Sequence, residues 1–145
     1  MKSKFLFLLM LPLFLLAGCS KEDDNPADDY DDKTEEAVYY VKYEVSMPNS
    51  LDEASATLKY VTFVSERGIL DFSTTRDSWS GIFGPFKKGD NVYLEVQSSE
   101  QVEGDWYACL SVSRGIEPFV LKDEDFSKGS TVWRTLFVGC VIPGY

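Results

Sequence analysis

The chain contains no histidine among its 145 residues. Histidine is the commonest general base in enzymes, a frequent metal ligand, and the partner that activates serine and cysteine nucleophiles. The acidic residues Asp90, Glu95, Glu100 and Glu103 offer carboxylates, but nothing in the sequence places two of them across a cleft, as glycosidase chemistry requires. We therefore predict that the protein is not an enzyme and uses no cofactor.

Basic residues are also scarce. The chain has 14 lysines and arginines against 24 aspartates and glutamates, which gives a formal net charge of −10 at pH 7. Nucleic-acid binding requires clustered positive charge, because contacts with phosphate supply most of the affinity. The composition therefore excludes nucleic acid as a partner, and a protein or a glycan is the expected partner class.

Cysteine is the third scarce residue, with three in the chain. Cys19 ends an apolar N-terminal run, which leaves Cys109 and Cys140 in the rest of the sequence. Outside the cytoplasm these two thiols can form a disulfide. The alternative is two buried free cysteines that fill small apolar spaces. No metal site is expected, because two cysteines without histidine do not complete the usual ligand set of zinc.

Only one long hydrophobic run is present, and it lies at the N-terminus. Lys2 and Lys4 introduce an uncharged apolar stretch that extends from Phe5 to Leu16. A positive start followed by about a dozen apolar residues is typical of a secretory signal and is short for a membrane span. We predict that residues 1–18 are a signal peptide.

The end of this run, "LAGC" at residues 16–19, matches the lipobox pattern and resembles that of bacterial lipoproteins. The resemblance implies that the chain is cut before Cys19 and that this residue is lipidated, so that acyl chains hold the protein at a membrane. The next residues resemble the acidic export signal of surface lipoproteins of the Bacteroidetes: Ser20, Lys21, Glu22, Asp23 and Asp24. The implied location is the outer membrane with the domain exposed at the cell surface. The alternative is a spacer for a domain that faces the periplasm.

Residues 19–36 continue this acidic character, with nine acidic and two basic residues. A segment of this composition cannot bury enough apolar surface to offset the entropy of ordering. We expect a lipidated cysteine followed by a disordered tether.

From residue 37 onward, apolar and polar side chains alternate in short runs that are separated by turn signals. This pattern predicts half-buried strands, no helix, and one antiparallel β-sandwich domain over residues 37–145. The predicted inward residues are Tyr39, Val41, Tyr43 and Val45; Ala56, Leu58, Tyr60 and Thr62; Val92, Leu94 and Val96; and Trp106, Ala108, Leu110 and Val112. "EPFVLKD" is expected to be a short or edge strand. Residues 131–142 are apolar on both faces, so their register stays open.

Four segments of this domain form a recurring outline: "VKYEVS", "ASATLKYV", "KKGDNVYLEV" and "WYACLSVSRG". The positions that carry it are Tyr43, Glu44, Val45, Ala56, Tyr60, Gly68, Trp79, Gly89, Asp90, Val92 and Leu94. This outline is similar to that of an immunoglobulin-like family of small anchored bacterial proteins, and the mycobacterial MmpS accessory proteins share it. The resemblance implies an immunoglobulin-like sandwich of about seven or eight strands. It implies little about chemistry, since such folds carry many functions.

Exposed aromatic side chains are the candidate ligand contacts. Trp79 lies in the polar stretch "RDSWSGIFG" and is the expected exposed tryptophan, whereas Trp106 is in step with core residues. Tyr93 and Tyr107 point outward by alternation. Such side chains can form contact hot spots with a protein or stack on sugar rings.

One acidic stretch, "KDEDFSKG", resembles the start of a calcium loop through Asp123, Asp125 and Ser127. The resemblance then fails, because the glycine is the seventh residue and position twelve is Arg134. We expect a solvated acidic loop there.

Taken together, these patterns predict a non-catalytic, membrane-anchored lipoprotein that acts as a binding or accessory module for a partner protein of the envelope. The alternative is a surface glycan-binding lipoprotein of a polysaccharide-uptake system.

Overall fold

Eight β-strands and no helix make up the described part of the chain, which covers residues 36–48, 56–129 and 132–143 of a computed structural model. The strands are β1 (Tyr39–Ser46), β2 (Lys59–Ser65), β3 (Gly68–Thr74), β4 (Ser78–Phe86), β5 (Asn91–Val102), β6 (Trp106–Arg114), β7 (Val120–Ser127) and β8 (Val132–Val141). The predicted all-β, antiparallel immunoglobulin-like sandwich is confirmed. No helix in these residues could span a membrane.

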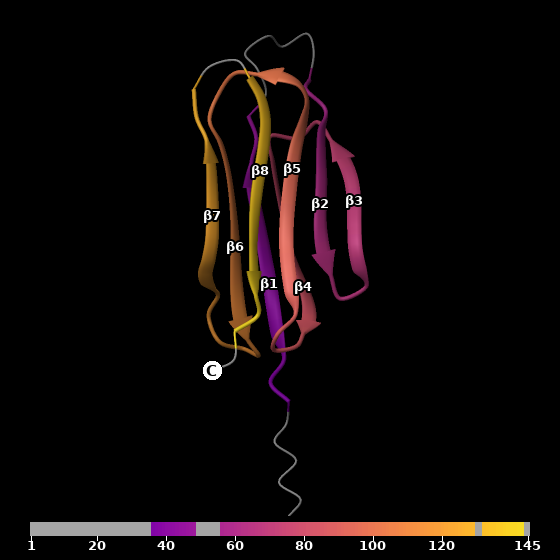
Figure 1. Cartoon of the computed structure of the whole chain (residues 1–145), viewed down its shortest axis with the longest axis vertical. Coiled ribbons are helices and arrows are strands. Elements are labelled where there is room, and N and C mark those ends of the chain that lie inside the picture. The colour runs from indigo at the N-terminus through magenta and orange to yellow at the C-terminus, as the bar shows by residue number, and fades with distance from the viewer. Residues whose placement is uncertain (1–35, 49–55, 130–131, 144–145) are drawn as a thin grey trace, which may run out of the picture. The chain divides into compact units, whose positions relative to one another are not determined.

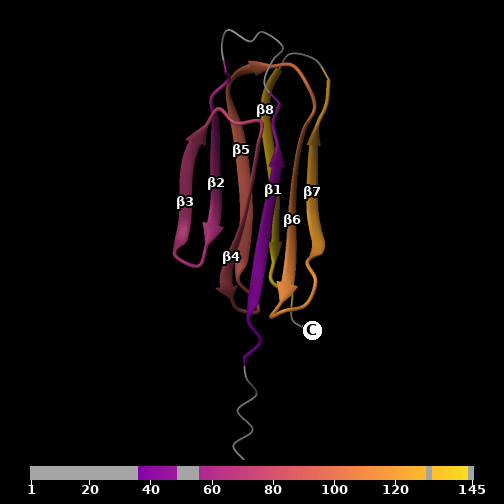
Figure 2. The same cartoon turned by 180° about the vertical axis from the view of Figure 1, so that it is seen from behind.

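The strands form two antiparallel sheets of four. Sheet A has the order β4-β1-β6-β7, and sheet B has the order β3-β2-β5-β8. Sheet B lies in front in Figure 1, and sheet A lies in front in Figure 2. Only the β2–β3 and β6–β7 connections stay within one sheet, so every other connection crosses between the layers. Because of these crossings, each sheet combines strands that are far apart in the sequence.

Alternation along three central strands determines the core between the sheets. On β1, β5 and β6 the predicted inward residues are all buried, as expected for strands that each contribute one face to the interior. Tyr43 is fully buried and donates its hydroxyl proton to the carbonyl oxygen of Val64 at 2.9 Å. Burial is the main cause that raises the pKa of this hydroxyl well above its usual value. The register of these three strands was therefore predicted correctly.

The register predicted for β2 is wrong by one residue. Val61 and Phe63 face inward, whereas Tyr60 is about half exposed. The prediction failed because Lys59 faces inward and is fully buried. Protein groups take the place of water around its ammonium group. Its Nζ atom donates to the carbonyl oxygens of Thr75 and Arg76, and it lies 3.7 Å from a carboxylate oxygen of Asp77.

The other residues predicted to face inward in this segment do not do so either. Ala56 is exposed and Leu58 is only partly buried, while Thr57 between them is buried. Thr62 faces outward, opposite Glu95 of β5.

Burial also lowers the pKa of the Lys59 ammonium group, and the nearby Asp77 carboxylate opposes that shift. A cation on the inner face of a strand is rare, so alternation alone favoured the wrong face.

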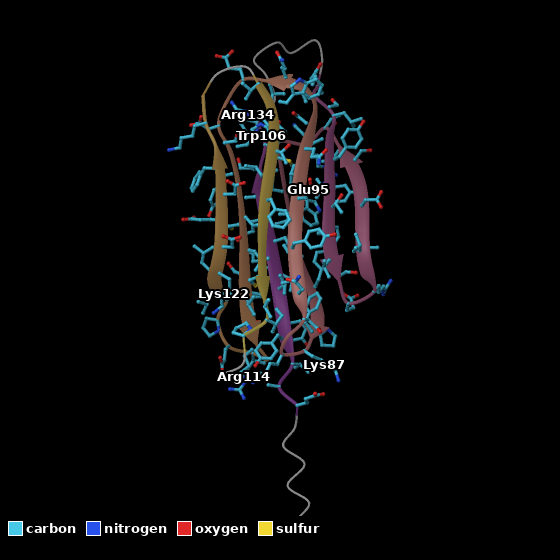
Figure 3. The ribbon with its side chains drawn as sticks, viewed as in Figure 1. Lys87, Glu95, Trp106, Arg114, Lys122 and Arg134 are labelled. Atoms are coloured by element: carbon cyan, nitrogen blue, oxygen red, sulfur yellow. The ribbon has the colours of Figure 1, made fainter. Side chains whose placement is uncertain are left out.

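Strand β8 resolves the register that the sequence left open. Leu136 and Val138 are buried, whereas Trp133 and Phe137 point to solvent. Arg134 is buried in step with the core residues. Its guanidinium donates to Ser127 Oγ at 2.6 Å and to the carbonyl oxygens of three loop residues: Gly104, Lys128 and Gly129. Arg134 and Trp106 lie near the same end of the sandwich (Figure 3).

Strand β7 is the expected edge strand, and its acidic residues have a structural role. The Asp125 carboxylate accepts a hydrogen bond from the Phe137 amide of β8 at 3.0 Å. The Asp123 carboxylate accepts one from the Gly139 amide at 2.8 Å. We call these two contacts the acidic seam. The seam joins β7 of sheet A to β8 of sheet B and occupies amide groups that an edge strand would otherwise expose.

Candidate functional site

The outer side of sheet B carries a group of apolar side chains that face solvent. We call it the aromatic face, and its members are Tyr60, Ile69, Tyr93, Trp133, Phe137 and Val141. Trp133 is 62% exposed and Phe137 is 55% exposed. The rings of Tyr93 and Phe137 stack with centroids 5.8 Å apart and planes inclined by 21°. Antiparallel sheets commonly have a polar outer face, so this composition is unusual for a sheet that only covers a core.

The register of sheet B places acidic groups among these rings. Glu95 of β5 pairs with Phe137 of β8 on one side and with Thr62 of β2 on the other. Thr62 in turn pairs with Asp71 of β3. The labelled Glu95 lies near the middle of this sheet in Figure 3. Among the described strand residues of sheet B, the two basic side chains, Lys59 and Arg134, both point inward. The aromatic face is therefore apolar and acidic.

Trp79 is less exposed than the sequence suggested. It is half-buried against the core and lies in a cluster of rings. Its centroid is 5.1 Å from that of Phe63, 5.3 Å from that of Phe72 and 6.2 Å from that of Phe83. This cluster fills the sandwich beside the edge strands β3 and β4. Packing against inward-facing phenylalanines explains the burial, because Trp79 itself faces inward on β4.

The three tryptophans thus occupy three environments. Trp106 is fully buried, as predicted, and its indole N–H donates to the carbonyl oxygen of Pro48. Trp133 is the exposed tryptophan, and it could not be predicted as such while the register of β8 was open. A signal was present, since Leu136 and Val138 are typical core residues and their facing places Trp133 outward.

The outer side of sheet A has a different character, although it includes one predicted ligand contact. Tyr107 points outward as expected and its ring lies 4.6 Å from that of Phe126 on β7. The hydroxyl of Tyr107 donates to the Glu124 carboxylate at 3.1 Å. Interaction with the Cys109 thiol is the main cause that raises the pKa of this hydroxyl above its usual value.

A shallow hollow of about 700 Å³ lies beside Tyr107 on this outer side. We call it the serine hollow, and its polar lining is Glu44, Ser46, Arg76, Ser78, Ser80 and Tyr107. The Glu44 carboxylate forms an ion pair with the Lys42 ammonium at 2.8 Å and accepts a hydrogen bond from the Cys109 thiol at 3.9 Å. Polar outward residues are what an antiparallel sheet normally presents to water.

Cys109 and Cys140 are both free thiols. They point in different directions, which explains why they do not meet. Cys109 is on the outer side of sheet A, under the serine hollow, while Cys140 of sheet B packs against the core. Burial raises the pKa of the Cys140 thiol. In this structure the two thiols are unpaired, and Cys140 is the one that packs against apolar core residues.

The remaining predicted sites lie elsewhere. Cys19 and the export signal at Ser20, Lys21, Glu22, Asp23 and Asp24 lie outside the described residues. The expected solvated acidic loop over the stretch "KDEDFSKG" is wrong, because Asp123 and Asp125 lie in strand β7 and form the acidic seam. Within the described ranges, no group of three or more acidic or cysteine side chains converges as a metal site would require.

Comparison with known proteins adds no family to this description. No family model matches the chain, and no curated protein matches it. The site must therefore be interpreted from its own chemistry.

Proposed function

We propose that this protein is a non-catalytic, lipid-anchored binding module, and that its aromatic face docks a partner protein of the bacterial envelope. The observation that carries the proposal is the exposure of Trp133, Phe137 and Tyr60 on one side of sheet B. Exposed apolar groups gathered on one face, with polar surroundings, mark interaction sites. Tryptophan and tyrosine are also enriched among the residues that dominate binding energy at interfaces.

Folding does not account for these side chains. The core of the sandwich is complete without them, because Leu136, Val138 and Leu94 already cover the inner side of sheet B. Each exposed ring is in contact with water, which costs free energy that burial against a partner would recover, at about 25 cal/mol per Å² of apolar area. A binding role gives a reason for this arrangement.

The charges on the aromatic face indicate which partner fits. Glu95 and Asp71 lie among the apolar groups, and the basic residues of these strands point inward. Two copies of this face brought together would oppose like charges, which disfavours a symmetric dimer. A partner with an apolar patch and basic residues around it would be complementary. We therefore commit to a basic, apolar protein surface as the occupant.

The N-terminal segment supports a place at the membrane. The lipobox resemblance at Cys19 suggests an acyl anchor, and the acidic residues after it suggest export to the cell surface. Protease treatment of intact cells tests the location. We expect the domain to be cleaved in the native chain and protected when residues 21–24 are replaced by alanine. Protection of both chains until the outer membrane is broken would place the domain in the periplasm.

The binding role is tested by photo-crosslinking the full chain in cells. A photoreactive amino acid replaces Phe137 on the aromatic face or, as a matched control, Ile82 on the outer side of sheet A. The two positions have similar exposure, 55% and 57%. We expect a single crosslinked protein from position 137, with the purified partner then binding the native chain and losing affinity as salt rises.

Three outcomes would contradict the proposal. One is equal crosslinking from the two positions, which would indicate nonspecific encounters. Another is a crosslinked species that consists of two copies of this chain. The third is crosslinking to lipid or glycan alone, which would give the aromatic face a different occupant.

A further inference from the structure

The serine hollow owes its shape to the side chains that pair across sheet A. Ser80 of β4 pairs with Glu44 of β1, and Glu44 pairs with Cys109 of β6. In the next row, Ser78 pairs with Ser46, and Ser46 pairs with Tyr107. Three short serines thus form a low floor, and the Tyr107 ring stands beside them. Contact with the tilted ring of Phe126, 4.6 Å away between centroids, holds the Tyr107 ring in place as a wall.

The polar groups of the hollow are available to a ligand. The hydroxyls of Ser46, Ser78 and Ser80 and the guanidinium of Arg76 make no hydrogen bond or ion pair with any described residue, and each of these four residues is exposed. Each hydroxyl can donate one hydrogen bond and accept others, and the guanidinium can donate several. Glu44 accepts from Lys42 and Cys109, but a carboxylate has about four acceptor sites, so it can accept further hydrogen bonds.

The charge balance of the hollow argues for a neutral ligand. Its two charged lining residues, Glu44 and Arg76, have opposite signs. An anionic or cationic ligand would therefore meet one attractive and one repulsive group, so the pair of charges favours neither sign. A ligand with many hydroxyls would instead match the mixture of donors and acceptors, and its apolar ring face could lie against Tyr107.

We propose that the serine hollow is a binding site for a neutral sugar residue, one hexopyranose ring of a glycan. The ring would pack on Tyr107 and exchange hydrogen bonds with the three serines, Glu44 and Arg76. A volume of about 700 Å³ is ample for one ring and falls within the usual range of small-molecule sites. This site is separate from the aromatic face and lies on the other sheet, so it stands or falls independently of the partner-binding role.

Saturation-transfer difference NMR on the full chain in detergent tests this proposal, because the method detects weak binding. The probes are the methyl pyranosides of glucose, galactose and mannose, with glucuronate as a charged comparison and empty micelles as the blank. We expect a saturable signal from at least one neutral pyranoside, and a weaker signal from glucuronate. Tyr107→Ala should reduce the affinity at least tenfold.

A second variant keeps the test independent of Tyr107, whose loss also removes the ring contact with Phe126. Ser80→Val fills the exposed floor of the hollow and should also abolish the signal, whereas Ser73→Val, at an exposed strand serine of sheet B, should not change it. No signal from any neutral pyranoside would overturn the proposal. So would a signal that survives Ser80→Val, a preference for glucuronate, or a signal lost in Trp133→Ala, which would move the sugar to the aromatic face.

Discussion

The two outer faces of this sandwich differ, although both belong to four-stranded antiparallel sheets. Sheet B presents a tryptophan, a phenylalanine and tyrosines to solvent, among them a stacked pair of rings. Sheet A presents serine and charged groups around a shallow hollow, and its exposed apolar side chains include Ile82, Leu121 and Phe126. Both inner faces are apolar and make one core. The inner faces supply the hydrophobic core that stabilises the fold. The composition of each outer face can therefore reflect what that sheet binds.

The largest expected effect separates an inner from an outer tryptophan. Trp106→Ala removes a fully buried ring and should lower the free energy of unfolding by about 3–5 kcal/mol. Trp133→Ala removes an exposed ring and should lower it by less than about 1 kcal/mol. Urea unfolding of the two variants measures both values. Similar losses in the two variants would show that Trp133 belongs to the core.

The next effect concerns binding and not stability. Trp133→Ala should weaken binding of the crosslinked partner by about 2 kcal/mol, or roughly 30-fold, because a large ring at an interface centre is a typical hot spot. Phe126→Ala, which removes an exposed ring from sheet A, is the control and should leave the affinity unchanged. Calorimetric titration with the purified partner measures both affinities. A larger loss of affinity in Phe126→Ala than in Trp133→Ala would contradict binding at the aromatic face.

A smaller effect is expected at the acidic seam, which joins the two sheets at one edge. Asp125→Ala removes the acceptor of the Phe137 amide and should cost about 1.5 kcal/mol of unfolding free energy. Glu124→Ala, on the same strand but pointing outward, should cost less. Amide hydrogen exchange at Phe137 should quicken in Asp125→Ala alone, and unchanged exchange would show that the seam does not protect β8.

The smallest effect at neutral pH comes from the buried hydroxyl of Tyr43, whose loss in Tyr43→Phe should cost about 1 kcal/mol. The folded state raises the pKa of this hydroxyl, so the unfolded chain loses the proton first as pH rises. The stabilising contribution is therefore complete below pH about 10, the ordinary tyrosine pKa, and is lost above it by about 1.4 kcal/mol per pH unit. Unfolding measured between neutral and alkaline pH should show the native chain's advantage over Tyr43→Phe shrinking and then reversing. A difference that stays constant with pH would contradict this assignment.

The sequence predicted the fold well where alternation coincided with polarity. Strands β1, β5 and β6 have apolar residues at every inward position of their central parts, so their registers could be inferred without knowledge of their neighbours. The same rule failed for β2 and gave no answer for β8. In both strands an inward position holds a long cation, Lys59 or Arg134.

These two cations share a physical explanation. Each extends its charged group to loop carbonyl oxygens, at residues 75 and 76 for Lys59 and at residues 104, 128 and 129 for Arg134. The loops are either distant in the sequence from the cation they bind or next to a turn whose path cannot be inferred from the hydrophobic pattern. Burial of the cations therefore depends on tertiary structure. The aromatic face could not be predicted for the same reason, because Tyr60 and Trp133 point outward only in the observed registers of β2 and β8.

The most direct test of the central claim asks whether the aromatic face is covered in the cell. A cysteine is placed on it by Thr135→Cys or, as a control, on the outer side of sheet A by Ile82→Cys, and the native chain corrects for Cys109 and Cys140. Alkylation rates are then compared between intact cells and the purified full chain. We predict that Thr135→Cys reacts more slowly in cells than after purification, while Ile82→Cys reacts at the same rate in both. Equal rates for Thr135→Cys in the two settings would show an uncovered face and contradict a docking role.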